Sequence, residues 1–161
     1  MQTQTSIKRV SNADRSFQNA AKYLKAVGCS VETRFTDNEK LAATITDPTD
    51  TKFVLRQIAS GILVGAAFRM PPTVDRDAML KQVNEFNHGA LAARFFIKED
   101  RSDNTVDFPD GKDCSVVAEA WNPGHCRTED FARLWTTLNK EIGKFLAAPT
   151  PDRSGSDGPD M

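Results

Sequence analysis

Residues 80–100 read LKQVNEFNHGALAARFFIKED, and this stretch joins a helix pattern directly to a strand pattern. Apolar residues recur at helical spacing as far as Phe86, which is typical of an amphipathic helix. From Ala93 to Ile97 every second residue is apolar, which is typical of a strand. Asn87 ends the helix pattern, and asparagine tolerates the left-handed conformation in which helices often end. We therefore interpret Asn87 as a structural cap rather than a ligand-binding residue.

Before this junction the sequence predicts one helix and four strands. The helix runs from about Ala13 to Val27, because its apolar residues share one face. Gly28 suits the left-handed position that follows a last helical turn. Alternating apolar residues predict the strands. The strands cover about 29–35, 41–45, 53–58 and 62–70, and Ser60-Gly61 forms a hairpin turn between the last two.

Two more helices and two more strands complete the pattern. The first of these helices follows the Met70-Pro-Pro-Thr73 break, with Thr73 as its predicted cap. Its predicted buried stripe is Met79, Leu80, Val83 and Phe86. The fifth strand starts at Ala93, and the sixth strand covers 116–120. The last helix runs from about Thr128 to Leu146 and has the strongest apolar stripe of the chain: Phe131, Leu134, Trp135, Leu138, Ile142 and Phe145.

The predicted fold class is α+β, with an antiparallel sheet packed with three helices in the order α-ββββ-α-ββ-α. Short turns between alternating strands indicate an antiparallel sheet, and the amphipathic helices must bury their stripes against it. We assign residues 13–147 to a single domain and residues 1–12 to a flexible N-terminus. Residues 148–161 are rich in Pro, Gly, Ser and Asp, so we expect a disordered C-terminal tail.

Composition and charge exclude several partners. The chain has 161 residues, 21 basic and 22 acidic, with a formal net charge of −1. This balance gives no electrostatic reason to expect nucleic acid or a membrane surface as a partner. The longest apolar run, Ile62–Phe68, is too short to span a bilayer. The N-terminus has no apolar stretch of a secretory signal, and an odd count of three cysteines favours reduced thiols in a cytoplasm.

Cys126 is the one candidate nucleophile that the sequence offers. It lies beside His125 and just before the last predicted helix, where a thiol pKa can be lowered. Adjacent side chains usually point apart, however, and no cysteine-protease signature surrounds it. We therefore predict no catalytic residue and keep a small cysteine-dependent hydrolase as a remote alternative.

Metal and cofactor motifs are also weak. A zinc site could be imagined from His88, Cys114, His125 and Cys126, but no CxxC or HxxxH spacing supports it. Five aspartates in the predicted loop 99–113 are better explained by a solvated acidic loop than by a calcium site, whose ligands are more closely spaced. These aspartates are Asp100, Asp103, Asp107, Asp110 and Asp113. We predict no metal and no cofactor.

Three segments carry a resemblance to a known family. They are the strand-turn-strand 53–64, the junction formed by 83–87 and 93–97, and the strand 116–120 with the helix from Thr128. Together they make the chain similar to the YbjN family of small bacterial proteins, whose fold is shared with class I type III secretion chaperones. The resemblance implies a non-enzymatic cytoplasmic protein with a regulatory or chaperone-like role. It also implies a homodimer, since the chaperone relatives are homodimers that hold extended segments of their partners.

The function predicted on this basis is protein binding, as a chaperone-like or adaptor module with an unidentified protein partner. The alternative is a bacterial sensory or stress regulator that acts through a protein partner. Apolar residues of the fourth strand and of the last helix, together with one tryptophan at a strand end, are the predicted contacts. They are Ile62, Val64, Phe68, Trp121, Trp135, Leu138 and Ile142. Trp121 is the best of these for an exposed contact, while the others are also candidates for the core.

Overall fold

The computed structural model of the chain describes residues 12–59, 61–71, 73–99 and 114–151. The predicted N-terminal segment 1–12, the acidic loop 99–113 and the tail 148–161 lie largely outside the described residues. The described elements are α1 (Asn12–Ala26), β1 (Ser30–Phe35), β2 (Leu41–Thr46), β3 (Lys52–Ile58), β4 (Gly61–Arg69), α2 (Arg76–Gly89), β5 (Arg94–Glu99), β6 (Cys114–Asn122) and α3 (Thr128–Ala147). The predicted α+β class, with a six-stranded antiparallel sheet and three helices, is confirmed.

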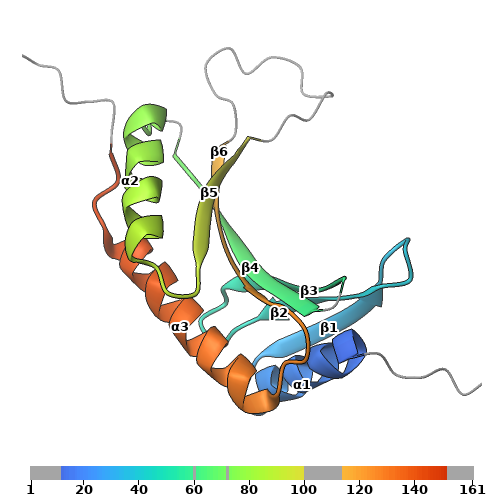
Figure 1. The fold of residues 1–161 in the computed structure, drawn as a ribbon. Coiled ribbons are helices and arrows are strands. Elements are labelled where there is room, and N and C mark those ends of the chain that lie inside the picture. Colours follow the sequence, from blue (N-terminus) through green and yellow to red (C-terminus); the bar gives the residue numbers. More distant parts are fainter. Residues whose placement is uncertain (1–11, 60, 72, 100–113, 152–161) are drawn as a thin grey trace, which may run out of the picture. The chain divides into compact units, whose positions relative to one another are not determined.

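The sheet has the hydrogen-bonded strand order β1-β2-β3-β4-β6-β5, so β1 and β5 are its two terminal strands (Figure 1). The chain divides into two compact units. Unit 1 comprises Met1–Leu63 with Trp121–Ala132, and unit 2 comprises Val64–Ala120 with Arg133–Met161. Each unit buries a set of apolar side chains of its own.

Unit 1 packs α1 against β1, β2 and β3 (Figure 1). The buried face of α1 carries Phe17 and Leu24, and β3 contributes Phe53 and Leu55, which alternate with exposed residues as predicted. The helix ends as expected: Gly28 has a φ of 90°, and the N–H of Cys29 donates to the carbonyl of Leu24 at 2.9 Å. This is the geometry in which glycine avoids the steric penalty of a side chain.

The start of β4 makes a close backbone approach to the end of β6. A Cβ atom added at Gly61 would lie 2.1 Å from the carbonyl oxygen of Asn122 and 2.9 Å from the Cα of Pro123. Any side chain at this position would therefore collide with main-chain atoms. The predicted hairpin glycine is required by packing against another strand and not only by the turn.

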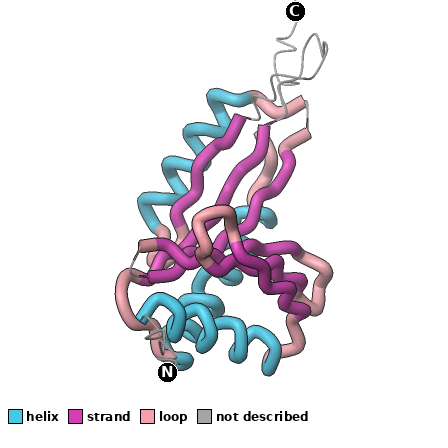
Figure 2. Tube along the Cα trace, turned by 90° about the vertical axis from the view of Figure 1, so that its right-hand side faces the viewer, coloured by secondary structure: helices cyan, strands magenta, loops and turns pink. Residues whose placement is uncertain are grey.

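Unit 2 places α2 alongside β5, which pairs antiparallel with β6 (Figures 1 and 2). Three phenylalanines from three elements form its aromatic centre. The ring centroid of Phe145 on α3 lies 4.9 Å from that of Phe95 on β5 and 5.0 Å from that of Phe86 on α2. Such contacts stabilise beyond the area that they bury. They join the predicted stripe of the last helix to the helix-to-strand junction.

Two predictions for the start and the buried face of α2 are wrong. The cap is Asp75 and not Thr73, because the Asp75 carboxylate accepts hydrogen bonds from the N–H groups of Asp77 and Ala78. A carboxylate also suits the positive end of the helix dipole. Leu80 does not join the buried stripe and is 47% exposed, since it lies about 100° around the helix from buried Met79.

Candidate functional site

Most of the predicted contact residues are buried within the described fold. Five of them have almost no exposed surface: Ile62, Val64, Trp135, Leu138 and Ile142. Their apolar side chains fill the cores of the two units, so they are not surface that the described chain offers to a partner. Phe68 is half-buried, and Trp121 is 57% exposed at the end of β6. Trp121 is therefore the predicted contact residue that lies clearly at the surface.

Asn87 holds the terminal strand β5 and is not a left-handed cap. It lies inside α2, whose C-cap is Ala90, and it is not among the described residues with positive φ. Its Nδ2 donates to the Phe95 carbonyl at 2.7 Å, and its Oδ1 accepts from the Phe95 N–H at 2.7 Å. The side-chain amide thus pairs with β5 as a residue of a neighbouring strand would. The prediction of a structural role for Asn87 is retained, but the mechanism is side-chain pairing with backbone.

Glu141 on α3 holds the loop that joins α2 to β5. Its Oε1 accepts from the N–H of Leu91 at 2.5 Å, and its Oε2 accepts from the N–H of Ala93 at 2.6 Å. The N–H of Ala92 lies 3.3 Å from both oxygens. Three successive N–H groups that converge on one carboxylate form an anion-binding nest, and here the anion is part of the same chain.

The hydrogen bonds of Asn87 and of Glu141 hold the strand and the loop that border a groove of unit 2, whose volume is about 440 Å³. Phe86 and Phe95 provide its aromatic lining, and Leu91 stands beside them with 91% of its surface exposed. Gly89 also lines the groove, and a Cβ atom added there would meet nothing within 4 Å. The size and the lining fit a site for a small ligand or for apolar side chains of a peptide.

The polar rim of the groove comes mainly from α3. Thr137, Lys140, Glu141 and Lys144 recur at helical spacing along one side of that helix, and Glu85 on α2 completes the lining. Among the described residues no ion pair joins Lys140 or Lys144 to a carboxylate, whereas the charge of Glu141 already faces the three N–H groups. The rim therefore carries the two ammonium groups on α3 and the exposed carboxylate of Glu85 on α2, so its α3 side favours an anionic neighbour for an apolar ligand.

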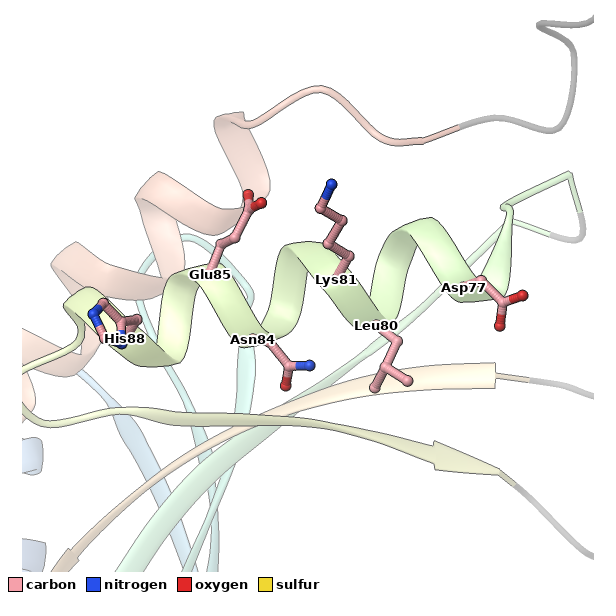
Figure 3. Close-up of a pocket in the computed structure, with 6 residues that line it drawn as sticks. All are labelled: Asp77, Leu80, Lys81, Asn84, Glu85 and His88. Atoms are coloured by element: carbon pink, nitrogen blue, oxygen red, sulfur yellow. The ribbon is translucent and has the colours of Figure 1, made fainter.

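A second hollow, of about 620 Å³, lies along the exposed surface of α2 and is formed by side chains of that helix alone. Figure 3 shows Leu80 and Asn84 pointing to one side of the helix, and Lys81 and Glu85 to the other. All the residues that form it are exposed. It is an open polar surface around one leucine, and its polar side chains do not point toward a common centre where a reaction could take place.

Cys126 is buried and poorly suited to nucleophilic attack. Burial and the nearby Asp130 carboxylate raise the pKa of its thiol to about 11, so the reactive thiolate is scarce at neutral pH. Its backbone is held to α1, because its N–H donates to Ser16 Oγ at 2.7 Å and its carbonyl accepts from Asn19 Nδ2 at 3.1 Å. The expectation that the helix start lowers this pKa is wrong, because desolvation dominates.

The remaining titratable candidates do not converge on one another. Within the described residues, no three His, Cys, Asp or Glu side chains are placed to share a metal ion. His88 is exposed on α2 in unit 2 and His125 is exposed in unit 1, while the side chain of Cys114 and the loop aspartates lie outside the described residues.

Sequence reasoning missed four residues of this site: Leu91, Lys140, Glu141 and Lys144. The one available signal was an apolar residue, Leu91, placed after Gly89 where the chain turns. Nothing local in the sequence indicates that Glu141 bonds a loop that is 50 residues away.

Comparison with protein-family models and with curated proteins finds no match for this chain. Among the described helices, none combines the length and the apolar character needed to cross a membrane.

Proposed function

We propose that this chain is a non-enzymatic, YbjN-like protein-binding module that acts as a chaperone-like or adaptor protein. In this proposal its fold is of the type III secretion chaperone type and it works as a homodimer in a bacterial cytoplasm. The groove of unit 2 is the observation that carries the proposal. Its loop is held by Glu141 and its bordering strand by Asn87, yet it leaves Leu91 almost fully exposed.

The exposed leucine extends the apolar lining of the groove, and its burial by a partner would be favourable because apolar surface is removed from water. A loop held in one conformation loses little further entropy when a partner binds. These features favour recognition of a partner over a merely tolerated apolar residue. Cys29 and Cys126 are both free thiols, which suits a reducing compartment.

The partner chemistry that fits the groove is an extended peptide segment in which large apolar side chains alternate with acidic ones. The apolar side chain would contact Phe86 and Leu91, and the acidic neighbour would face the ammonium groups of Lys140 and Lys144. Charges on the rim would then give orientation and selectivity, while the aromatic lining gives most of the affinity.

Fluorescence anisotropy with two short labelled peptides tests this function. One peptide alternates glutamate with leucine and phenylalanine, and the other replaces each glutamate by lysine. We expect the acidic peptide to bind the wild-type chain and the basic peptide to bind at least about tenfold more weakly. Equal affinity for both peptides, or none for either, would count against the groove as a peptide site.

A pair of glycine variants locates the binding. Gly89→Trp fills the groove, while Gly143→Trp places the same side chain at a glycine of α3 that does not line it. Neither added Cβ meets an atom within 4 Å, so both variants should fold. We expect Gly89→Trp to abolish peptide binding and Gly143→Trp to leave it unchanged.

A regulator that acts through a protein partner is the alternative and would use the same groove. The cysteine-dependent hydrolase is disfavoured by the buried thiol of Cys126 and by its raised pKa. Turnover of an ester or amide substrate that Cys126→Ala abolished would revive it.

A further inference from the structure

The two terminal strands of the sheet differ in how their free edges are treated. On β5, the Asn87 amide occupies both the N–H and the carbonyl of Phe95. On β1, no other described segment donates to or accepts from the outward backbone groups. Unpaired edges template pairing with another chain, and folded proteins usually block them. The Asn87 amide thus occupies one residue of β5, whereas on β1 the outward groups lack a described partner along the whole strand.

The ladder between β1 and β2 shows which residues face this edge. Phe35 is opposite Leu41, and in the adjoining turn the N–H of Thr36 donates to the Lys40 carbonyl at 2.8 Å. Because hydrogen-bonded pairs alternate along an antiparallel ladder, the even-numbered residues of β1 bond to β2. The N–H and carbonyl groups of Val31, Thr33 and Phe35 therefore point outward.

Two usual protective devices of an edge strand, proline and a bulge, are missing from β1. The strand contains no proline, and its register with β2 is continuous from Ser30 to Phe35, with no bulge. Phe35 is 74% exposed, although it shares a face with the buried Leu41 and Ala43 of β2. The charges that remain, Glu32 and Arg34, have opposite signs, so they block pairing with a generic strand less than two like charges would.

We propose that β1 pairs antiparallel with β1 of a second copy of this chain, about a two-fold axis at Thr33. This register places Glu32 opposite Arg34 of the second copy, and Val31 opposite Phe35, twice each by symmetry. Opposite charges and apolar-aromatic pairs are the favourable cross-strand combinations. The outward backbone groups of Val31, Thr33 and Phe35 then meet their counterparts in hydrogen-bonded pairs.

Neighbouring registers are disfavoured by the same residues. Only the backbone groups that point away from β2 can pair with those of the second copy. The nearest alternative registers therefore place the two-fold axis at Glu32 or at Arg34. The first would oppose two glutamates on the axis and the second would oppose two arginines, and like charges directly opposite destabilise a strand pair. The strand is thus complementary to itself in one register.

This inference rests on the proposed function, because it assigns an interface to the homodimer proposed there. It uses unit 1 alone, whereas the peptide groove lies in unit 2, so the two can fail separately. If the chain bound no peptide, the test of the dimer would be unaffected. If the chain formed no dimer, the groove variants would still report whether a peptide binds in unit 2.

A charge-swap series with the full chain tests the interface by sedimentation equilibrium or light scattering over a concentration range. Glu32→Arg alone opposes two arginines and Arg34→Glu alone opposes two glutamates, so each should raise the dimer dissociation constant at least about tenfold. The double swap restores both pairs and should restore the dimer. Mixing the two single variants should give a heterodimer.

The matched control is Arg56→Glu on β3. Its side chain is exposed on a strand that is not terminal, so this variant should leave self-association unchanged.

A backbone variant removes the pairing by a second route. Thr33→Pro deletes an N–H that does not bond to β2, which is the edge position where proline is tolerated. It should remain folded by circular dichroism and become monomeric. A wild-type chain that is monomeric at high concentration would overturn the inference. A dimer that survives both single charge changes and Thr33→Pro would also overturn it and would place the homodimer interface elsewhere.

Discussion

Asn87 shows how one side chain can stabilise a sheet edge from a neighbouring helix. Asn87→Ala leaves the N–H and the carbonyl of Phe95 without their partner, so we expect the free energy of unfolding to fall by about 1–3 kcal/mol. Asn84→Ala is the matched control, because Asn84 is an exposed asparagine of the same helix and should change stability by less than about 0.5 kcal/mol. Urea denaturation of both variants checks this, and equal effects would contradict the role of Asn87.

Cys126 gives stability a pH dependence in the alkaline range. The pKa of its thiol is about 11 in the folded chain against 9.0 for an ordinary cysteine. Below pH 9 the thiol is neutral in both states, so its contribution to the free energy of unfolding is fully present. Between pH 9 and 11 the unfolded chain ionises first, and this contribution is lost, on the order of 2–3 kcal/mol in all.

The Cys126→Ala variant isolates this contribution, because other groups titrate identically in both chains. We expect the wild-type advantage in unfolding free energy to shrink from pH 9 to pH 11, measured by guanidinium denaturation at several pH values. An advantage that stays constant across that window would show that the thiol is not held neutral by the fold.

At the scale of the elements, the loop between α2 and β5 depends on a carboxylate from α3. Glu141→Ala removes the acceptor of three successive N–H groups, so we expect a loss of about 1–3 kcal/mol in stability and faster amide exchange at Leu91, Ala92 and Ala93. Lys140→Ala, one residue away on the same helix, should leave those amides unchanged. Unchanged exchange in Glu141→Ala would mean that the loop holds its conformation without α3.

The contact between β4 and β6 predicts a second effect at this scale. Gly61→Ala forces a methyl group onto the Asn122 carbonyl, so we expect a destabilisation of about 3 kcal/mol or more. Gly143→Ala, in the open interior of α3, should instead stabilise by about 0.5–1 kcal/mol. Thermal unfolding of the pair checks both signs, and a neutral Gly61→Ala would show that the strands can separate at low cost.

The elements that could be predicted from sequence are those that local patterns specify. The alternation of Phe53 and Leu55, the stripe of α3 and the left-handed Gly28 all arise from residues close together in the chain. The interactions of Asn87 and Glu141 could not be predicted, because each joins a side chain to the backbone of another element. Leu80 was placed wrongly because spacing alone does not tell the centre of an apolar stripe from its flank.

At the scale of the whole molecule, the proposed function is recognition rather than chemistry. The buried thiol of Cys126 is held neutral, and the polar groups of Asn87 and Glu141 are occupied by backbone. Among the large apolar side chains that the structure describes, the two most exposed are Leu91 beside the groove and Phe35 on the strand edge. A module that pairs with itself through β1 and receives a peptide in the groove accounts for both.

Residue-resolved hydrogen exchange, measured on dilute and concentrated solutions of the 161-residue chain, tests self-pairing through β1 most directly. The amides of Val31, Thr33 and Phe35 should gain protection as the concentration rises, because the dimer gives them acceptors that the described residues of one chain do not. The amides of Glu32 and Arg34 bond to β2 in both states and should change much less. Exchange at Val31, Thr33 and Phe35 that does not depend on concentration would contradict the proposed dimer.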